Sequence, residues 1–293
     1  MAEVLPAAER TRLNRERALA HVPGCETGAP PLELRALHGG TANHSWLVRT
    51  RQGRFVLRVH SASAVLGADH AREALLQSCA AAAGLAPALI AVDPRGRFMV
   101  SEFVRGARWN ATDMNEPRPL ARLARRLAML HSLTAPRARS FDPAALVRAH
   151  VRHLGGTRDR EVARLQPLLA RVAPTLRMLA ASNRARCMVH GDLHHSNLLG
   201  RGRPRLVDWE YASVSDPIFD LGCLTAYYPA AARYSELLLD ESGLAQSASV
   251  EDLRAASWLY CLLSYLWYRR LREFGPVGRT VRAHERTLLA RLI

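Results

Sequence analysis

Lysine is missing from this chain of 293 residues, so all 41 basic residues are arginine. Without lysine the chain cannot contain a Schiff-base lysine, a Walker A lysine or an S-x-x-K nucleophile. Any cation that binds a phosphate group must therefore be an arginine. The formal net charge is +15, but the arginines are spread along the whole length without a dense tract. We therefore expect no nucleic-acid partner, and a basic nucleic-acid-binding protein is kept only as an alternative.

Cysteines and long apolar runs are also scarce. The five cysteines are far apart and form no C-x-x-C pair, so we expect reduced, mostly buried thiols in a cytoplasmic protein. The most apolar stretch, residues 256–268, is interrupted by Ser257 and Ser264 and is too short to span a bilayer. Residues 1–14 carry acids and no apolar core, so we expect neither a signal peptide nor a membrane partner.

The first hundred residues alternate between apolar and polar side chains with a period of two. This alternation predicts five short strands, over residues 32–37, 45–48, 55–59, 88–92 and 98–103. One helix is expected after the third strand, from an N-cap at Asp69 to Gly84, with Ala71, Leu75 and Cys79 on one face. Beyond residue 104 the pattern is mostly helical, with short strands expected at 187–189 and 205–207. Periodicity alone indicates an α+β fold.

The strongest chemical motif is HGDLHHSN at residues 190–197, followed by Asp208 in the segment LVDWEY. Phosphoryl transfer needs a carboxylate beside the attacking hydroxyl and oxygen ligands for magnesium. In this interpretation Asp192 orients and deprotonates the acceptor, and Asn197 and Asp208 hold the metal ion. The motif therefore predicts an ATP- and Mg²⁺-dependent phosphotransferase.

Three histidines in the same loop suggest a rival interpretation, a metal-hydrolase centre. Such a centre needs a second histidine–carboxylate cluster downstream, where only His284 remains. We instead expect His190 to anchor the loop, and His194 and His195 to be polar loop residues.

The chain resembles the superfamily of aminoglycoside phosphotransferases, choline kinases and thiamine kinases. The resemblance covers about residues 36–292 and is tightest at 188–222, where those relatives carry H-G-D-x-x-x-x-N and D-W-E-Y-A. It implies a bilobal protein-kinase-like fold of the α+β class, with a small five-stranded antiparallel N-lobe carrying one helix and a larger, mostly helical C-lobe. Gly191 stands where protein kinases carry arginine, and no A-P-E segment follows Asp208, so a protein kinase is a poor interpretation.

This layout gives the predicted domain boundaries. An N-terminal helical extension is expected over residues 1–27, with a charged helix at 6–20. A nucleotide-binding N-lobe is expected over residues 28–103, and a C-lobe for catalysis and acceptor binding over residues 104–293.

The resemblance also assigns supporting roles. Arg58 stands where most kinases have a phosphate-clamping lysine, with Glu73 as its expected partner; the alternative is a surface arginine on an edge strand. Asp220 is expected to support the catalytic loop through the backbone of that loop. Glu210 is either a residue near the metal or a solvent-facing strand residue, and the sequence leaves both open.

The other ATP-binding candidates belong to an expected glycine-rich loop, to a hinge whose backbone binds adenine, and to two apolar side chains that sandwich the ring. They are Gly40, Thr41, Asn43 and Ser45 in the loop, Glu102 and Val104 in the hinge, and Val56 and Leu199 around adenine.

Aromatic residues make up only 6% of the chain, yet all seven tyrosines and three of five tryptophans follow residue 200. They could form an aromatic box for a cationic alcohol such as choline, ethanolamine or thiamine, or they could simply pack in the core. The candidate acceptor-binding residues are Glu210, Tyr211, Tyr227, Trp258 and Trp267. The second acceptor class is an aminoglycoside or another sugar, which needs an acidic pocket. A nucleotide-binding pseudokinase that acts as an interaction module is the alternative of another class.

Overall fold

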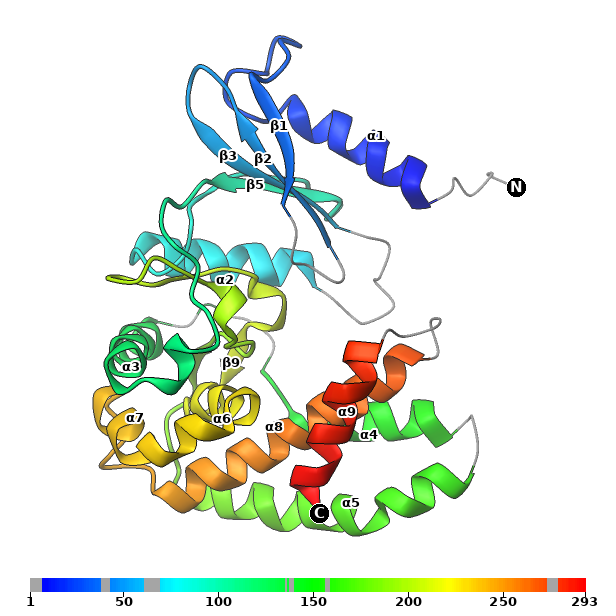
Figure 1. Ribbon diagram of the computed structural model, residues 1–293, viewed down its shortest axis with the longest axis vertical. Coiled ribbons are helices and arrows are strands. Elements are labelled where there is room, and N and C mark those ends of the chain that lie inside the picture. The colour runs from blue at the N-terminus through cyan, green and yellow to red at the C-terminus, as the bar shows by residue number, and fades with distance from the viewer. Residues whose placement is uncertain are drawn as a thin grey trace. The chain divides into compact units, whose positions relative to one another are not determined.

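The computed structural model describes residues 7–37, 43–60, 69–134, 136, 140–155, 159–272 and 279–293 (Figure 1). The chain forms two compact units. Unit 1 comprises Met1–Trp109 and Ser196–Ala212, and unit 2 comprises Asn110–His195 and Ser213–Ile293. The polypeptide therefore leaves unit 1, returns to it for one short segment, and leaves it again.

Unit 1 is built on one antiparallel sheet with the strand order β1-β2-β3-β5-β4. The strands are β1 (Glu33–Leu37), β2 (Asn43–Arg49), β3 (Arg54–His60), β4 (Leu89–Val92) and β5 (Phe98–Glu102). In β3, Phe55, Leu57 and Val59 are buried, whereas Val56 and Arg58 are half-buried, as expected for side chains that alternate between two faces. The central strand of unit 1 thus presents an arginine on the face opposite its apolar residues.

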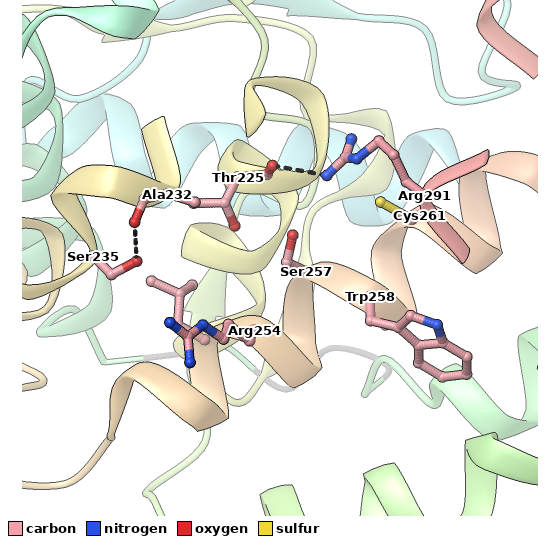
Figure 2. A pocket seen from close by; sticks show the side chains of 9 residues that line it. Thr225, Ala232, Ser235, Arg254, Ser257, Trp258, Cys261 and Arg291 are labelled. Carbon is pink, nitrogen blue, oxygen red and sulfur yellow. Dashed lines mark hydrogen bonds between the residues drawn. The ribbon is translucent and has the colours of Figure 1, made fainter. Parts of the chain in front are cut away.

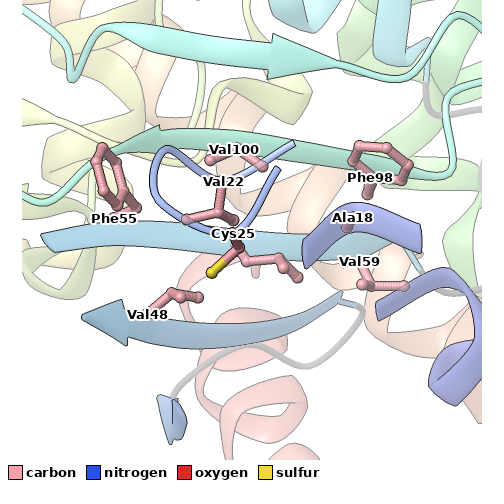
Figure 3. Packing of buried hydrophobic residues seen from close by; sticks show 9 residues of the cluster. Ala18, Val22, Cys25, Val48, Phe55, Val59, Phe98 and Val100 are labelled. Carbon is pink, nitrogen blue, oxygen red and sulfur yellow. The ribbon is translucent and has the colours of Figure 1, made fainter. Parts of the chain in front are cut away.

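Helix α1 (Ala7–Leu19) and the turns after it cover the apolar face of this sheet. Ala18, Val22 and Cys25 are buried against strand residues such as Phe55 and Val59 (Figure 3). The sequence separates residues 1–27 as an extension, but the described part of that stretch contributes side chains to the core of unit 1. The compact units divide the chain at other positions than the predicted boundaries at 27/28 and 103/104. Those boundaries remain predictions.

Helix α2 (His70–Ala82) starts at the predicted N-cap, where the Asp69 carboxylate accepts a hydrogen bond from the backbone N–H of Arg72. Its buried face carries Glu73, Leu76 and Ala80, whereas Leu75 is exposed. Ala71, Leu75 and Cys79, which the sequence places on one face, lie on the more exposed side of the helix. Apolar periodicity could not reveal that the charged Glu73 lies on the inward face.

The returning segment, residues 196–212, is held in unit 1 by backbone hydrogen bonds. Strands β7 (Leu198–Leu199) and β8 (Arg205–Leu206) form a short hairpin, and the N–H of Leu206 donates to the carbonyl of Leu85. The N–H of Trp109 donates to the carbonyl of Leu198. A Cβ on Gly106 would lie 2.9 Å from the Cα of Gly200, so this approach requires glycine. These contacts bring Asn197 and Asp208 into the same unit as Arg58.

Unit 2 is mostly helical. Its helices are α3 (Pro117–His131), α4 (Pro143–Gly155), α5 (Asp159–Ala181), α6 (Ile218–Tyr227), α7 (Ser235–Glu241), α8 (Val250–Leu271) and α9 (Arg279–Leu292). Strands β6 (Cys187–Val189) and β9 (Ser213–Ser215) pair antiparallel. Helix α6 packs closely against α8 at Gly222. A Cβ at this position would lie only 2.7 Å from the Cβ of Ala256, so the close approach requires glycine.

A five-stranded antiparallel sheet with one inserted helix, followed by a larger helical part, confirms the predicted fold class. Within the described ranges, no helix combines the length and the apolar character that crossing a bilayer requires.

Candidate active site

Arg58 is the centre of a charged cluster inside unit 1. Its Nη2 lies 2.7 Å from Oε1 of Glu73, and its Nη1 lies 3.1 Å from Oδ1 of Asp208. Nη2 also lies 3.9 Å from Oε2 of Glu210. Strand β3, helix α2 and the returning segment therefore meet at one guanidinium. The alternative of a surface arginine does not describe this side chain, which is only 14% exposed.

Burial and charge act against each other in this cluster. Burial opposes the charged form of Arg58, but the carboxylates of Asp208, Glu73 and Glu210 raise the pKa of Arg58 above its ordinary value. Burial also opposes ionised Glu73, yet Arg58 and His70 hold the pKa of Glu73 below its usual value. Both groups therefore stay charged at neutral pH. Three carboxylates face a single guanidinium, which leaves excess negative charge in the cluster when all are ionised.

The buried ends of these side chains lie against one another. Oε1 of Glu73 and Oδ1 of Asp208 are both buried, and each contacts the Arg58 guanidinium. The Asp208 side chain is nevertheless 40% exposed. Excess negative charge and this partly exposed carboxylate together fit a divalent cation that prefers oxygen ligands.

Asp208 has an unusual backbone conformation. Its φ is +66° and its ψ is 70°, in the left-handed region that non-glycine residues seldom adopt, although aspartate tolerates it better than most. The side chain is 40% exposed although Oδ1 is buried, so Asp208 reaches both Arg58 and the surface. Asn197 is buried in the same unit, and its backbone carbonyl accepts the N–H of Val207. Both predicted metal ligands therefore lie on the segment that returns to unit 1.

Glu210 lies beside this cluster rather than in solvent. Its Oε2 accepts a hydrogen bond from Nδ2 of Asn43 at 3.2 Å, and its backbone carbonyl accepts one from Arg72. Burial and the neighbouring Asp208 raise the pKa of Glu210. Of the two options left open by the sequence, the position near the metal candidates describes Glu210 better.

The remaining nucleotide candidates lie on unit 1. Ser45 in β2 pairs in register with Arg58, and Val56 follows the same β2–β3 ladder. The Glu102 carboxylate pairs with Arg205, and the backbone N–H of Glu102 donates to Ala88. Within the described chain, the N–H of Val104 has no backbone partner, as a hinge donor for adenine requires. Leu199 is half-buried in β7. Gly40 and Thr41 lie outside the described residues.

Asp192 lies in unit 2, on the loop after β6. Its Oδ1 accepts a hydrogen bond from the hydroxyl of Tyr227 at 3.0 Å, and its Oδ2 lies 3.4 Å from Nε2 of His194. Burial alone would raise the pKa of Asp192, but His194, His190 and the Tyr227 hydroxyl hold it below the ordinary value. Asp192 is therefore an ionised carboxylate that can accept a proton.

One face of helix α6 fixes this loop. Asp220, Cys223 and Tyr227 are spaced i, i+3 and i+7, so they share a side of the helix. The Asp220 carboxylate accepts the N–H of His190 at 3.1 Å and the N–H of Gly191 at 2.9 Å. The Cys223 sulfur accepts the N–H of Leu193 at 3.2 Å. This arrangement agrees with the loop-supporting role proposed for Asp220.

Side chains from other elements complete the support. His131 Nε2 in α3 lies 3.0 Å from Oδ2 of Asp220, and Tyr260 in α8 donates to the carbonyl of Gly191 at 3.2 Å. The Nδ1 of buried His190 accepts the N–H of Asp192 at 3.3 Å. The hydroxyl of Tyr228 accepts a hydrogen bond from the backbone N–H of His195. The same hydroxyl lies 2.6 Å from Nδ1 of the His195 ring. The local pattern assigned no loop-supporting role to Tyr228, Tyr260, Cys223 or His131, because their partners are distant in sequence.

The structure gives the loop histidines no metal cluster. In the described part of the chain, the one group of three adjacent potential ligands is His60, His70 and Glu73, in unit 1. The rings of His60 and His70 stack at 3.6 Å with an angle of 9°. A metal ion could not lie in both ring planes at a bond length of about 2 Å, so this stacked pair is a poor chelator.

The candidate aromatic residues are divided between the units. Tyr211 is 44% exposed in unit 1. In unit 2, Tyr227 contacts Asp192 directly, and its ring lies edge-on to His194 at 5.6 Å. Trp258 instead packs under the guanidinium of Arg171 at 4.3 Å, and Trp267 packs edge-on to Tyr268 at 5.1 Å. Of these four aromatic residues, Tyr227 is the one with a described contact to Asp192.

The sheet with its buried arginine–glutamate pair and the supported HGD loop define a kinase-like fold. The chain matches the model of the phosphotransferase enzyme family over residues 33–258, and it belongs to that family. No curated protein sequence is a match.

Solved structures share the fold at low sequence identity. A choline/ethanolamine kinase family protein from Mesorhizobium loti is 24% identical, with a TM-score of 0.77 over 96% of this chain and 93% of that one. Choline kinase LicA from Streptococcus pneumoniae is 20% identical, with a TM-score of 0.74 over 92% and 95% of the two chains. A mutant aminoglycoside phosphotransferase bound to ADP and hygromycin B is 19% identical, with a TM-score of 0.67 over 92% and 94%.

Replacing Arg58 by methionine tests the charge balance of the cluster. The change leaves three carboxylates without a cation, so the free energy of unfolding should fall by about 3–5 kcal/mol. Urea denaturation measures this difference. Arg54→Met, an exposed arginine on the same strand, is the matched control and should change stability by less than about 0.5 kcal/mol. Equal effects of the two substitutions would contradict the central role of Arg58.

Proposed function

We propose that this chain transfers the γ-phosphate of ATP to a hydroxyl group of a small acceptor, with Mg²⁺ as the required cation. Membership of the phosphotransferase family supports the reaction class. The observation that carries the proposal is the ionised carboxylate of Asp192, oriented by Tyr227 on one oxygen and by His194 on the other. A fixed, ionised carboxylate is the group that phosphoryl transfer needs beside an attacking hydroxyl.

Asp192 would accept the proton of the acceptor hydroxyl as the oxygen attacks the γ-phosphorus. The Tyr227 hydroxyl can remain a donor throughout, because desolvation of the hydroxyl and the adjacent Asp192 carboxylate raise the pKa of Tyr227 well above its ordinary value. Two neighbours on the carboxylate fix its orientation. This positioning function explains why a tyrosine and a histidine flank the base.

The unit 1 cluster supplies the complementary chemistry. Asp208 and Asn197 would hold Mg²⁺, which would neutralise charge on the nucleotide phosphates. Arg58, kept charged by its carboxylate neighbours, would bind phosphate oxygens as lysine does in other kinases. The backbone at Glu102 and Val104 would bind adenine. Gly40, Thr41, Asn43 and Ser45 would contribute to phosphate binding in the same proposal.

For the acceptor, we favour a cationic alcohol of the choline, ethanolamine or thiamine type. Tyr227 presents a partly exposed aromatic ring next to Asp192. Aromatic faces attract a compact cation, whereas a polycationic aminoglycoside needs several carboxylates. The second acceptor class remains an aminoglycoside or another sugar, because one solved relative binds hygromycin B.

Asp192→Asn tests the reaction itself. It should lower kcat by roughly 10²–10⁴-fold while leaving nucleotide affinity unchanged, because only the proton acceptor is lost. ADP release with the best acceptor gives kcat, and calorimetry gives nucleotide affinity. Near-wild-type turnover by Asp192→Asn would show that Asp192 is not the catalytic base. Complete absence of turnover in the wild-type chain with every acceptor would favour a nucleotide-binding pseudokinase.

Two substitutions of Tyr227 separate base positioning from acceptor recognition. Tyr227→Phe keeps the ring and loses the hydroxyl, so kcat should fall while KM for the acceptor is unchanged. Tyr227→Ala also loses the ring, so KM should rise by up to about thirtyfold, the equivalent of about 2 kcal/mol. Tyr234→Phe, at a tyrosine of unit 2 without a described contact to the loop, is the control.

Salt dependence distinguishes the two acceptor classes in the same assay. For a cationic alcohol held by aromatic rings, KM should change little as the ionic strength rises. A KM that rises steeply with salt and is indifferent to Tyr227→Ala would identify a polycation held by carboxylates.

A further inference from the structure

A cavity of about 190 Å³ lies within unit 2, and its lining includes Trp258 but none of the residues assigned above to the base, the metal ion or the nucleotide. One face of helix α8 forms its longest wall, with Arg254, Ser257 and Cys261 on successive turns. Arg291 of α9 and Thr225 of α6 line the opposite part (Figure 2). One buried water needs only about 10–15 Å³ of such space, so the cavity can hold a ligand of several non-hydrogen atoms.

Arg291 is held in place by the end of helix α6. Its guanidinium donates to the carbonyls of Ala226 and Thr225, as Figure 2 shows for Thr225. These carbonyls belong to the last turn of the helix, where a positive group is favourable. An arginine carries five N–H donors, and two of its nitrogens are engaged in this way. Among the described residues Arg291 pairs with no carboxylate, so a fixed guanidinium with further donors borders the cavity.

The other polar groups of the lining include no acid. Arg254 is exposed and pairs with Glu251, which lies outside the lining, so the cavity opens to solvent at this residue. The hydroxyls of Ser235 and Thr225 already donate to the carbonyls of Ala232 and Leu221, so they offer no proton to an anion. Ser257 adds a further hydroxyl to the lining. Two guanidinium groups and the Ser257 hydroxyl, without a lining carboxylate, form a positive site with hydrogen-bond donors.

We propose that this cavity is a binding site for a small phosphate dianion, either inorganic phosphate or a phosphate monoester. Guanidinium groups match the oxygens of a tetrahedral phosphate, and a dianion gains more than a monoanion from two positive groups. The cavity is lined only by residues of unit 2, and phosphate binding there does not depend on the proposed reaction. Binding could therefore be present in a variant such as Asp192→Asn that has lost turnover.

Calorimetric titration of the full chain with inorganic phosphate tests the site, at constant ionic strength set with sodium chloride. Glycerol 3-phosphate and acetate are titrated in parallel, to separate the monoester from free phosphate and the dianion from a carboxylate. Arg254→Gln removes a cation at the mouth. Ser257→Asp places a carboxylate in the cavity without disturbing the bonds from Arg291 to α6. Arg282→Gln, an exposed arginine of α9 outside the lining, controls for the loss of net charge.

The proposal predicts saturable phosphate binding that weakens at least about tenfold in Arg254→Gln and Ser257→Asp and is unchanged in Arg282→Gln. Tighter binding of glycerol 3-phosphate would assign the site to a monoester, and equal or weaker binding would assign it to free phosphate. The proposal is wrong if wild-type binding does not saturate below about 10 mM, or if acetate binds equally well. It is also wrong if Arg282→Gln loses as much affinity as Arg254→Gln. Melting curves without phosphate confirm that each variant is folded.

Discussion

The contact of one arginine with three carboxylates is the constraint on which unit 1 depends. Arg58 reaches Glu73 on helix α2 and both Asp208 and Glu210 on the segment that returns from unit 2. A buried charge without a partner is strongly destabilising, so each of these elements must be in place for the others to be stable. The same arrangement leaves excess negative charge and a partly exposed Asp208 carboxylate, which fit a divalent cation. Stability and proposed function thus share one set of atoms.

In unit 2, the main structural constraint is that a short loop with an ionised carboxylate is held in one conformation. Helix α6 does this with three side chains on a single face, and α3 and α8 reinforce it through His131 and Tyr260. Gly191 has a φ of +76°, so the loop turns sharply just before Asp192. Close packing of α6 on α8 at Gly222 keeps this support rigid. The Asp192 carboxylate is therefore oriented by the fold and not by a flexible side chain alone.

Sequence periodicity and capping residues predicted the secondary structure that depends on neighbouring residues. The five strands, the helix after the third strand and its N-cap at Asp69 follow from periodicity and capping. The HGD motif identified Asp192, whereas Arg58 and Glu73 were assigned through the family resemblance. Periodicity does not reveal that Glu73 of α2 is buried, because its burial depends on the ion pair with Arg58 of strand β3. The supporting roles of Cys223, Tyr228 and His131 depend on contacts across tens of residues, which no periodicity reveals. The packing of Val22 and Cys25 on the sheet is a tertiary effect of the same kind.

The central claim is that the unbalanced carboxylates around Arg58 bind a divalent cation together with nucleotide phosphates. Calorimetric titration of ATP into the wild-type chain and into Asp208→Asn, with and without magnesium chloride, tests it most directly. The account predicts that Mg²⁺ tightens ATP binding to the wild type, and that this tightening is lost in Asp208→Asn because the isosteric amide removes a charged ligand. ATP binding that depends equally on Mg²⁺ in both proteins would contradict the account.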